Sequence, residues 1–321
     1  MLVLNEKDIN YAVSMNDLMA AIEQAYTLYE KNLYEMPARN HIADKENTYL
    51  LMPCIANQTI GTKIVSVFPS NKDYPVTQGI VILTNRENGT TKALLNGTIL
   101  TGLKTGAVGG VAMKYLSSEN IHTVGLIGTG YQGLFQLIAA CSVRNIKHIY
   151  LYNRTSSRLP SFIKTLNEQL TTDVEIHVVD NALELVKQSE VIITATSAHD
   201  PVLPNDSMIY NGKLIIGIGS YQPHMREFPQ NLYLNLDSLY IDTFDAKHES
   251  GDIIDPIKKQ WITESQLISF SKVITQKVLP QITNDHPNVF KSTGMALFDL
   301  VCAECIYEKA IQNQVGHYLS L

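Results

Sequence analysis

The chain is poor in cysteine, with only Cys54, Cys141, Cys302 and Cys305 among its 321 residues. Four cysteines are too few for a disulfide framework in a chain of this length. Cys302 and Cys305 form a CxxC, but no second cysteine or histidine pair stands at the spacing of a zinc site. Positions i and i+3 share one helix face, and the surrounding stretch is rich in alanine, leucine and valine. We therefore expect this pair to pack in a core.

The sequence also lacks a basic excess, a long apolar run and a secretory leader. Lys and Arg number 25 against 31 Asp and Glu, a net charge of −6, whereas nucleic-acid-binding proteins usually carry a basic excess. No apolar run reaches the roughly 18 residues that a membrane-spanning helix needs. The amino terminus has no basic segment followed by a long apolar one. We therefore expect a cytoplasmic protein that binds neither nucleic acid nor membrane.

Length and patterning predict more than one domain. The chain is about twice the usual single-domain length, and 45% of its residues are hydrophobic, which is enough for a sizeable core. Helical spacing of apolar residues predicts a helix over 16–34, and short β-like runs over 48–95 predict an antiparallel or mixed sheet. A second helical pattern over 99–116 contains four glycines. Because glycine destabilises a helix, we expect these glycines to allow close approach of another element or a ligand.

After residue 117, β-rich runs alternate with helix-like segments, the pattern of βαβ units in a doubly wound parallel sheet. We expect an α/β protein with a Rossmann domain at 118–290. We expect residues 1–117 to form an α+β substrate-binding and dimerisation domain, to which a long C-terminal helix at 291–321 returns. Because one amphipathic helix can hardly cover both faces of the sheet over 48–95, we also expect this sheet to form a homodimer.

A glycine motif predicts dinucleotide binding. Residues Gly128, Thr129, Gly130, Tyr131, Gln132 and Gly133 follow an apolar strand and open a helix pattern. In such a GxGxxG, the first glycine allows a tight turn, the second lets the backbone approach a pyrophosphate, and the third lets the helix pack closely on the strand. The helix N-terminus supplies N–H donors to the phosphates. A glycine-rich turn without a ligand is the alternative.

The end of the next strand bears on which dinucleotide binds. NAD-binding folds usually place Asp or Glu about 20 residues after the glycines, on the ribose 2′-hydroxyl. Here Asn153, Arg154, Thr155 and Arg158 stand instead, with no carboxylate to repel a 2′-phosphate and two guanidiniums able to hold one. We expect NADP(H) to be preferred, with NAD(H) possible. Alternatively, the two arginines are solvated loop charges.

Three cations, Arg39, Lys63 and Lys104, stand in apolar surroundings. Lys63 interrupts a β-like run, where a buried ammonium is unfavourable unless an anion pairs with it. For each cation alone, a surface ion pair is the commoner explanation. In a chain with a dinucleotide domain, the three together suggest a clamp for a carboxylate.

These segments resemble the ornithine cyclodeaminase/mu-crystallin family over essentially the whole chain. The matching stretches are PARNHI, LLMP, GTKIVSVFPSN, GIVILTNRENGTTKALLNGTILTGLKTGA, VGLIGTGYQG, YNRT, IGIGSYQPHMRE and VFKSTGMALFDL. The resemblance implies a homodimer of chains with a Rossmann domain and a split substrate domain. It implies a small amino or imino acid substrate whose carboxylate meets Arg39, Lys63 and Lys104, the last at a position where the family usually has Arg. Further implied cofactor-binding residues are Thr105, Thr194, Ala195, Thr196, Ser197, Gly219, Ser292 and Gly294.

Two departures separate this chain from the cyclodeaminases that it resembles. Leu50 replaces a Glu that meets the distal amine of a diamine, and Tyr221 replaces an Asp that activates amine or water. The resemblance therefore implies an NAD(P)H-dependent reductase of small cyclic or linear α-imino acids, such as a ketimine or pyrroline-2-carboxylate. Lys63, Tyr221 or water is the candidate proton donor, although packing is the commoner role for a tyrosine such as Tyr221. An ornithine cyclodeaminase and a non-catalytic, crystallin-like ligand-binding protein stay open as alternatives.

Overall fold

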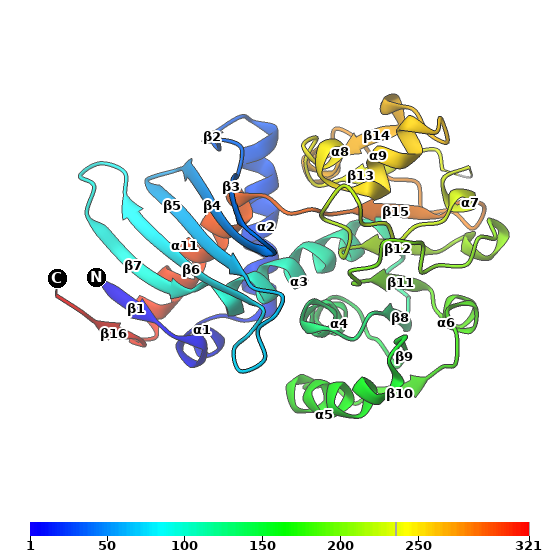
Figure 1. Ribbon diagram of the computed structural model, residues 1–321, viewed down its shortest axis with the longest axis horizontal. Coiled ribbons are helices and arrows are strands. Elements are labelled where there is room, and N and C mark those ends of the chain that lie inside the picture. The colour runs from blue at the N-terminus through cyan, green and yellow to red at the C-terminus, as the bar shows by residue number, and fades with distance from the viewer. Residues whose placement is uncertain (235, 321) are drawn as a thin grey trace. The chain divides into compact units, whose positions relative to one another are not determined.

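The structure is a computed structural model that describes residues 1–234 and 236–320, and it divides into two compact units (Figure 1). Unit 1 comprises Met1–Lys104 and Met295–Leu321, and unit 2 comprises Thr105–Gly294. Unit 1 thus combines the two ends of the chain, and the first division falls inside helix α3 (Gly97–Leu116). No helix among the described residues is long and apolar enough to cross a membrane.

Unit 1 is built on an eight-stranded sheet in the order β16-β1-β7-β6-β5-β4-β2, with β3 also paired to β4. All neighbouring strands are antiparallel except β1 and β7, which confirms the antiparallel or mixed sheet predicted over 48–95. The strands are β1 (Leu2–Leu4), β2 (Tyr34–Glu35), β3 (Asn40–Asp44), β4 (Asn47–Ala56), β5 (Thr59–Val67), β6 (Thr77–Asn85), β7 (Thr91–Asn96) and β16 (His317–Tyr318).

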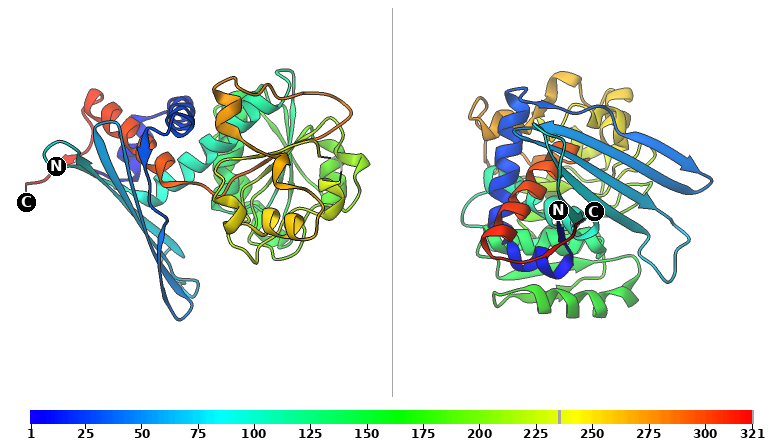
Figure 2. Two further views of the ribbon diagram at one scale, coloured as in Figure 1. Left: turned by 90° about the horizontal axis from the view of Figure 1, so that it is seen from above. Right: turned by 90° about the vertical axis from the view of Figure 1, so that its left-hand side faces the viewer.

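Helices α2 (Met15–Glu30) and α11 (Ala296–Gln312) lie against one face of this sheet, beside the short helix α1 (Glu6–Ala12) (Figure 2). The inward residues of β5 alternate along the strand, as a half-buried strand requires. Gly61 is one of them, and a Cβ on it would lie 2.7 Å from the Leu300 side chain. The missing side chain therefore lets α11 pack directly on β5.

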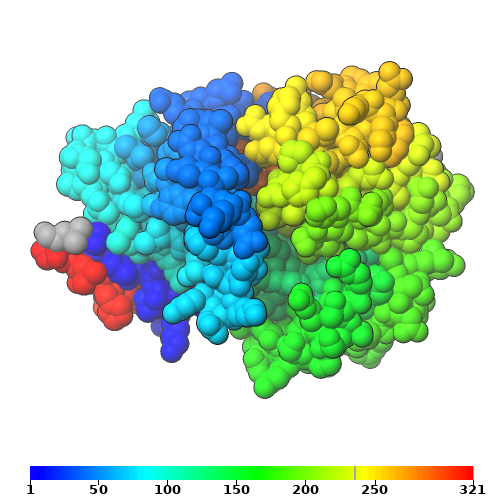
Figure 3. Space-filling model, in the orientation of Figure 1, coloured from blue at the N-terminus to red at the C-terminus, as the bar shows by residue number. Residues whose placement is uncertain are grey.

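The other face of the sheet carries apolar side chains that are only partly buried. Leu51, Ile64 and Ile80 pair across β4, β5 and β6 and form one row on this face. In the space-filling view, the surface over these strands is formed by strand residues, without α2 or α11 in front of them (Figure 3). An apolar sheet face of this kind is a candidate surface for association.

The predicted C-terminal helix is longer than the observed one. Helix α11 ends at Gln312, and His317–Tyr318 form β16 beside β1. Gln314 and Gly316 have φ values of 55° and 98°, in the left-handed region, which a helix cannot continue through. The helix prediction over 291–321 was therefore wrong for residues 291–295 and 313–320.

Unit 2 contains an eight-stranded, fully parallel sheet in the order β10-β9-β8-β11-β12-β15-β13-β14. This confirms the predicted α/β class and doubly wound sheet, whose topological switch point lies between β8 and β11. The strands are β8 (Thr123–Ile127), β9 (His148–Tyr152), β10 (Glu175–Val178), β11 (Val191–Thr194), β12 (Leu214–Gly217), β13 (Leu239–Ile241), β14 (Leu267–Ser269) and β15 (Asn288–Lys291).

Helices flank this sheet, with α4 and α5 on one side of its first strands and α6 on the other (Figure 1). Besides α3, the α-helices are α4 (Tyr131–Val143), α5 (Leu159–Gln169), α6 (Ala182–Gln188), α7 (Gln230–Tyr233), α8 (Ala246–Glu249), α9 (Gly251–Lys258) and α10 (Phe270–Ile274). The glycines of α3 serve close packing, as expected. A Cβ on Gly106 would lie 2.6 Å from the Phe135 carbonyl oxygen, and one on Gly109 would overlap the Gln136 side chain.

Candidate active site

Lys63 lies on the helix-covered face of the unit 1 sheet, in the same cross-strand row as Met52 and Val81. Its side chain is only 5% exposed. The strand alternation explains this placement, because residues 61 and 65 of β5 point to the same side as residue 63. Lys63 therefore places a charged side chain inside a buried strand, as its position in the sequence predicts.

Asp299, in the first turn of α11, is the counter-ion that sequence analysis missed. Its Oδ2 lies 2.8 Å from Lys63 Nζ, and its Oδ1 lies 3.8 Å from Lys104 Nζ on α3. Both ion-pair partners of Asp299 are buried, as is Asp299 itself. The N-terminus of α11 also favours a negative charge here. One carboxylate thus faces two buried ammonium groups.

The electrostatics of this cluster are unbalanced toward positive charge. Burial lowers the pKa of Lys63 from 10.5 to about 8; Asp299 opposes the shift, while Lys104 and Arg39 lower the pKa further. Two buried lysines therefore share one carboxylate, an arrangement that attracts a further anion.

Leu50 lies next to this cluster on the same side of the sheet. It pairs with Val65, and Met52, two residues along β4, pairs with Lys63. The side chain beside the cations is therefore apolar. Glu46 and Asp44, the nearest acids before Leu50 in sequence, lie near the β3–β4 turn, where Glu46 accepts a hydrogen bond from Ser70.

The glycine loop between β8 and α4 has the form that the motif predicts. Gly128 has a φ of 98°, and a Cβ on it would lie 2.6 Å from the Ala195 carbonyl oxygen. A Cβ on Gly133 would lie 2.5 Å from the Gly128 carbonyl oxygen, so this glycine allows α4 to pack on β8. By contrast, no heavy atom lies within 4 Å of the Cβ position on Gly130, the N-cap of α4.

Open space therefore adjoins the N-terminus of α4, which no side chain caps. In the described part of the chain, the buried atoms Thr129 Oγ1 and Gln132 Oε1 have no hydrogen-bond partner. An uncapped helix N-terminus beside a Cβ-free glycine fits a pyrophosphate. The Tyr131 side chain is 47% exposed at the first turn of α4.

The residues after β9 are exposed and basic. Asn153 donates a hydrogen bond to the Thr155 carbonyl oxygen and shapes the turn. Arg154 and Arg158 are exposed, and neither guanidinium forms an ion pair within residues 1–234 and 236–320. Both are therefore available to an anionic ligand.

Several predicted cofactor residues are held by a buried carboxylate that sequence analysis missed. Glu227 accepts hydrogen bonds from the Thr194 hydroxyl, from the Thr196 hydroxyl and backbone N–H, and from the Gly219 N–H, at 2.7–3.0 Å. The two threonine hydroxyls thus donate to the protein itself. Ala195 and the exposed Ser197 lie in the same segment after β11. Glu227 therefore positions the loops that follow β11 and β12.

Glu227 belongs to a fully buried charge cluster. Lys291 Nζ lies 3.9 Å from Glu227 Oε2 and 3.5 Å from Asp252 Oδ2, and all three side chains are 0% exposed. Burial raises the pKa of Glu227, while Lys291 opposes that shift. Asp252 also accepts hydrogen bonds from the N–H groups of Glu227 and Phe228. Lys291 is thus the counter-ion of both buried acids, Glu227 and Asp252.

Asp242, just after β13, orders the segment that joins β15 to α11. It accepts hydrogen bonds from the Ser292 hydroxyl at 2.7 Å, from the Thr293 N–H at 3.0 Å and from the Gly294 N–H at 2.6 Å. Thr105 is the first residue of unit 2, within α3. Its carbonyl oxygen accepts a hydrogen bond from the side-chain amide of Gln136. The hydroxyl of Ser292 is therefore engaged within unit 2.

Tyr221 lies on the loop after β12, and its side chain is 45% exposed. This exposure argues against a role in core packing. Partial desolvation raises the pKa of the phenol above its ordinary value, so the hydroxyl keeps its proton at neutral pH. Tyr221 is chemically able to donate a proton.

A model of the ornithine cyclodeaminase/mu-crystallin family matches residues 1–314. The chain belongs to this family. Delta(1)-pyrroline-2-carboxylate reductase from Bacillus cereus is 31% identical to this chain over an alignment of 324 positions, which covers 98% of each chain.

Solved structures of the family share the fold over the whole chain. The structure of Thermococcus litoralis Delta(1)-pyrroline-2-carboxylate reductase in complex with NADH and L-proline has a TM-score of 0.93 at 30% identity, covering 99% of this chain and 100% of that chain. An archaeal alanine dehydrogenase dimer with bound NAD has a TM-score of 0.90 at 26% identity, covering 100% of this chain and 99% of that chain.

The acids that sequence analysis missed share one signal. Asp299 is the one carboxylate in the apolar first half of α11, Glu227 is followed by Phe228, and Asp252 is followed by two isoleucines. Lys63 and Lys291 are lone cations within apolar strands. A charged residue within an apolar stretch predicts a buried partner of opposite charge, but the sequence does not say which one.

Proposed function

We propose that this chain is an NAD(P)H-dependent reductase that reduces the C=N bond of small cyclic or linear α-imino acids of the pyrroline-2-carboxylate type. The observation that carries the proposal is the pair of buried ammonium groups, Lys63 and Lys104, that share the carboxylate of Asp299. A substrate carboxylate is the anion that such a cluster binds best. The names of the full-length relatives support the same reaction class.

The cluster binds and orients the substrate. Lys63 and Lys104 hold the carboxylate, and Arg39 adds a third positive charge. Lys104 keeps the charge of the usual arginine but contacts the carboxylate as a point donor rather than as a bidentate fork. Their positive charge also makes the neighbouring imine carbon more electrophilic. When bound, a nicotinamide dinucleotide supplies the hydride.

The glycine loop Gly128–Gly133 and the N-terminus of α4 would hold the pyrophosphate of the dinucleotide. The residues from Thr194 to Ser197, with Gly219, Ser292, Gly294 and Thr105, complete the cofactor site. We propose NADP(H) as the preferred form, since Arg154 and Arg158 are exposed and no carboxylate follows β9. The relative solved with NADH supports the use of NAD(H) as well. A ratio of kcat/KM for NADPH over NADH below 1 would reject the preference.

The reduction also needs a proton at the imine nitrogen. Lys63 is one candidate donor, because an ammonium with a pKa of about 8 is a stronger acid than an ordinary lysine. Tyr221 is the second candidate, since its raised pKa keeps the phenol protonated. An iminium substrate that arrives already protonated needs neither.

Leu50 favours a substrate without a distal charge. A distal ammonium beside Leu50 loses its water and gains no anion, which costs several kcal/mol. Leu50 therefore argues against the alternative function of an ornithine cyclodeaminase. A non-catalytic ligand-binding protein is opposed by the retained cations, which serve no purpose for an uncharged ligand.

We also propose that the protein is a homodimer formed through the open face of the unit 1 sheet. The row of Leu51, Ile64 and Ile80 supplies an apolar surface that α2 and α11 leave uncovered. The related alanine dehydrogenase was solved as a dimer.

One experiment tests the function directly. The purified protein is incubated with NADPH or NADH and a panel of cyclic imines, or of α-keto acids with amines, and nicotinamide absorbance is followed. We expect oxidation of the cofactor with pyrroline-2-carboxylate or a similar ketimine. Absence of turnover across the panel, together with measurable binding of the same compounds, would instead favour the ligand-binding alternative.

A further inference from the structure

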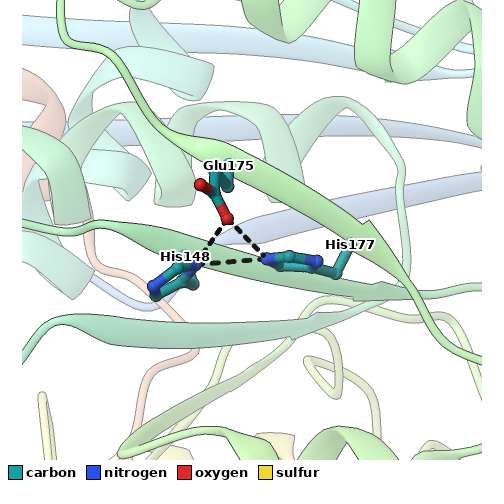
Figure 4. A group of neighbouring side chains, drawn as sticks. All are labelled: His148, Glu175 and His177. Atoms are coloured by element: carbon teal, nitrogen blue, oxygen red, sulfur yellow. Dashed lines mark hydrogen bonds and ion pairs between the residues drawn. The ribbon is translucent and has the colours of Figure 1, made fainter.

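His148, Glu175 and His177 form a cluster on the outermost strands of the unit 2 sheet, β9 and β10 (Figure 4). In the parallel register, His148 pairs with Glu175, and Tyr150 pairs with His177. Residues two apart on a strand share a face, so the three side chains project from the same side of the sheet. The cluster lies at the amino end of β9, whereas the predicted cofactor residues follow its carboxyl end.

The three donor atoms converge on one point. His148 Nδ1 lies 3.2 Å from His177 Nε2 and 3.3 Å from Glu175 Oε2, and His177 Nε2 lies 3.6 Å from the same oxygen. In a tetrahedral zinc site with bonds of about 2.0–2.1 Å, neighbouring ligand atoms are about 3.3–3.4 Å apart. A single point about 2 Å from all three atoms therefore exists, slightly out of their plane.

We propose that this cluster is a zinc site, in which His148, Glu175 and His177 supply three ligands and solvent supplies the fourth. Two imidazoles and one carboxylate are ligands that Zn²⁺ prefers, whereas Mg²⁺ and Ca²⁺ favour all-oxygen sites. The side chains are 38%, 72% and 38% exposed, so an ion reaches them without opening the fold.

One ligand is held in place by the protein. The His177 ring stacks on Tyr150 with ring centroids 4.9 Å apart and an interplanar angle of 20°. Tyr150 in turn packs against the hydrophobic core of the unit. This contact restrains the orientation of His177, which reduces the entropy lost when an ion binds.

The ion would join the edge of the sheet to its interior. Strand β10 lies at the edge of the sheet and has only four residues. All four are exposed or only partly buried. Glu175 and His177 belong to β10, and His148 belongs to β9. Zinc therefore links the edge strand to its neighbour by side chains as well as by the backbone ladder, and it stabilises this edge.

The cysteine pair of the chain is a poor competitor for the ion. Cys302 is buried, and burial raises the pKa of the Cys305 thiol to about 11. Because a thiolate is the form that binds metal, neither group is ready at neutral pH. The variant Cys305→Ser tests this point directly.

The experiment titrates Zn²⁺ alone into the EDTA-treated, desalted full-length protein, in competition with a chromophoric chelator. We expect one high-affinity site per chain. His148→Ala and His177→Ala should each weaken binding about tenfold or more, and the double variant should lose the site. Zn²⁺ should raise the midpoint of thermal unfolding of the wild type but not of the double variant, and Mg²⁺ at equal concentration should leave it unchanged.

The matched control is His224→Ala. His224 and His199 also form a histidine pair, with ring centroids 4.9 Å apart, but no acid or thiol completes a three-ligand group around them in the described residues. This variant and Cys305→Ser should bind Zn²⁺ as the wild type does. Unchanged binding by the His148→Ala/His177→Ala double variant would overturn the proposal, as would loss of binding in either control.

Discussion

Lys63 Nζ lies 2.8 Å from Asp299 Oδ2, although the two residues come from a strand near the start of the chain and from its last helix. The pair is buried, and Lys104 Nζ lies 3.8 Å from the other carboxylate oxygen, Oδ1 of Asp299. A buried ion pair usually needs excellent geometry to balance the loss of hydration. Here the second lysine leaves the cluster positive, which suits a site that binds a carboxylate.

Replacing Lys63 with Met should abolish imine reduction while leaving dinucleotide binding intact. The variant removes a cation proposed to hold the substrate carboxylate, whereas the glycine loop belongs to unit 2. We expect a loss in kcat/KM of at least about 100-fold, or roughly 2.7 kcal/mol. Lys92→Met is the control, since Lys92 lies on the same sheet but donates to Thr59. Wild-type turnover in Lys63→Met would show that the lysine is a plain structural ion pair.

Activity should fall as the pH rises through about 8. The pKa of Lys63 is lowered to about 8, so the side chain is charged below this pH and neutral above it. Since Asp299 raises the pKa of Lys63, Asp299→Asn should move the alkaline limb of kcat/KM to lower pH. Tyr221→Phe should leave this limb in place. A limb that stays fixed in Asp299→Asn would assign it to another group.

Ornithine with NAD⁺ should yield neither proline nor ammonia. Its distal ammonium would lie beside Leu50 without a counter-ion, which weakens binding by about 3 kcal/mol, or more than 100-fold relative to norvaline. Competition of both amino acids against the imine substrate measures this difference. The variant Leu50→Glu should reduce the difference in affinity between ornithine and norvaline, because the glutamate supplies a counter-ion for the distal ammonium. Efficient ammonia release from ornithine by the unmodified protein would promote the cyclodeaminase alternative.

Replacing Lys291 with Met should destabilise the protein by about 3–5 kcal/mol, because it leaves Glu227 and Asp252 buried without their cation. Denaturant unfolding followed by circular dichroism measures the change. Lys247→Met is the matched control: it breaks an ion pair with Glu264 near the surface and should cost less than about 1 kcal/mol. Equal stabilities of the two variants would mean that the buried cluster contributes nothing.

Ile64→Glu should convert the protein to a monomer at micromolar concentration. Ile64 lies between Leu51 and Ile80 on the open face of the sheet, and a buried carboxylate without a partner strongly opposes association. Light scattering gives the mass of each species. Glu87→Gln, in the exposed turn after β6, is the control and should stay dimeric. A monomeric wild type would refute the proposed dimer.

The sequence by itself determined the features that depend on neighbouring residues. The doubly wound unit follows from alternating strand and helix patterns, and the roles of Gly128, Gly130 and Gly133 follow from their spacing between β8 and α4. The inward position of Lys63 follows from the alternation of β5. These features are local, because backbone geometry and steric limits act over a few residues.

Only the tertiary structure decided which distant side chains meet. Asp299 reaches Lys63 because α11 packs on β5. Glu227, on the loop after β12, meets Lys291 at the end of β15. His148 meets Glu175 because the register of β9 and β10 sets them opposite each other. No periodicity encodes such pairs, since they depend on the order of strands in a sheet and on the packing of elements far apart in the chain.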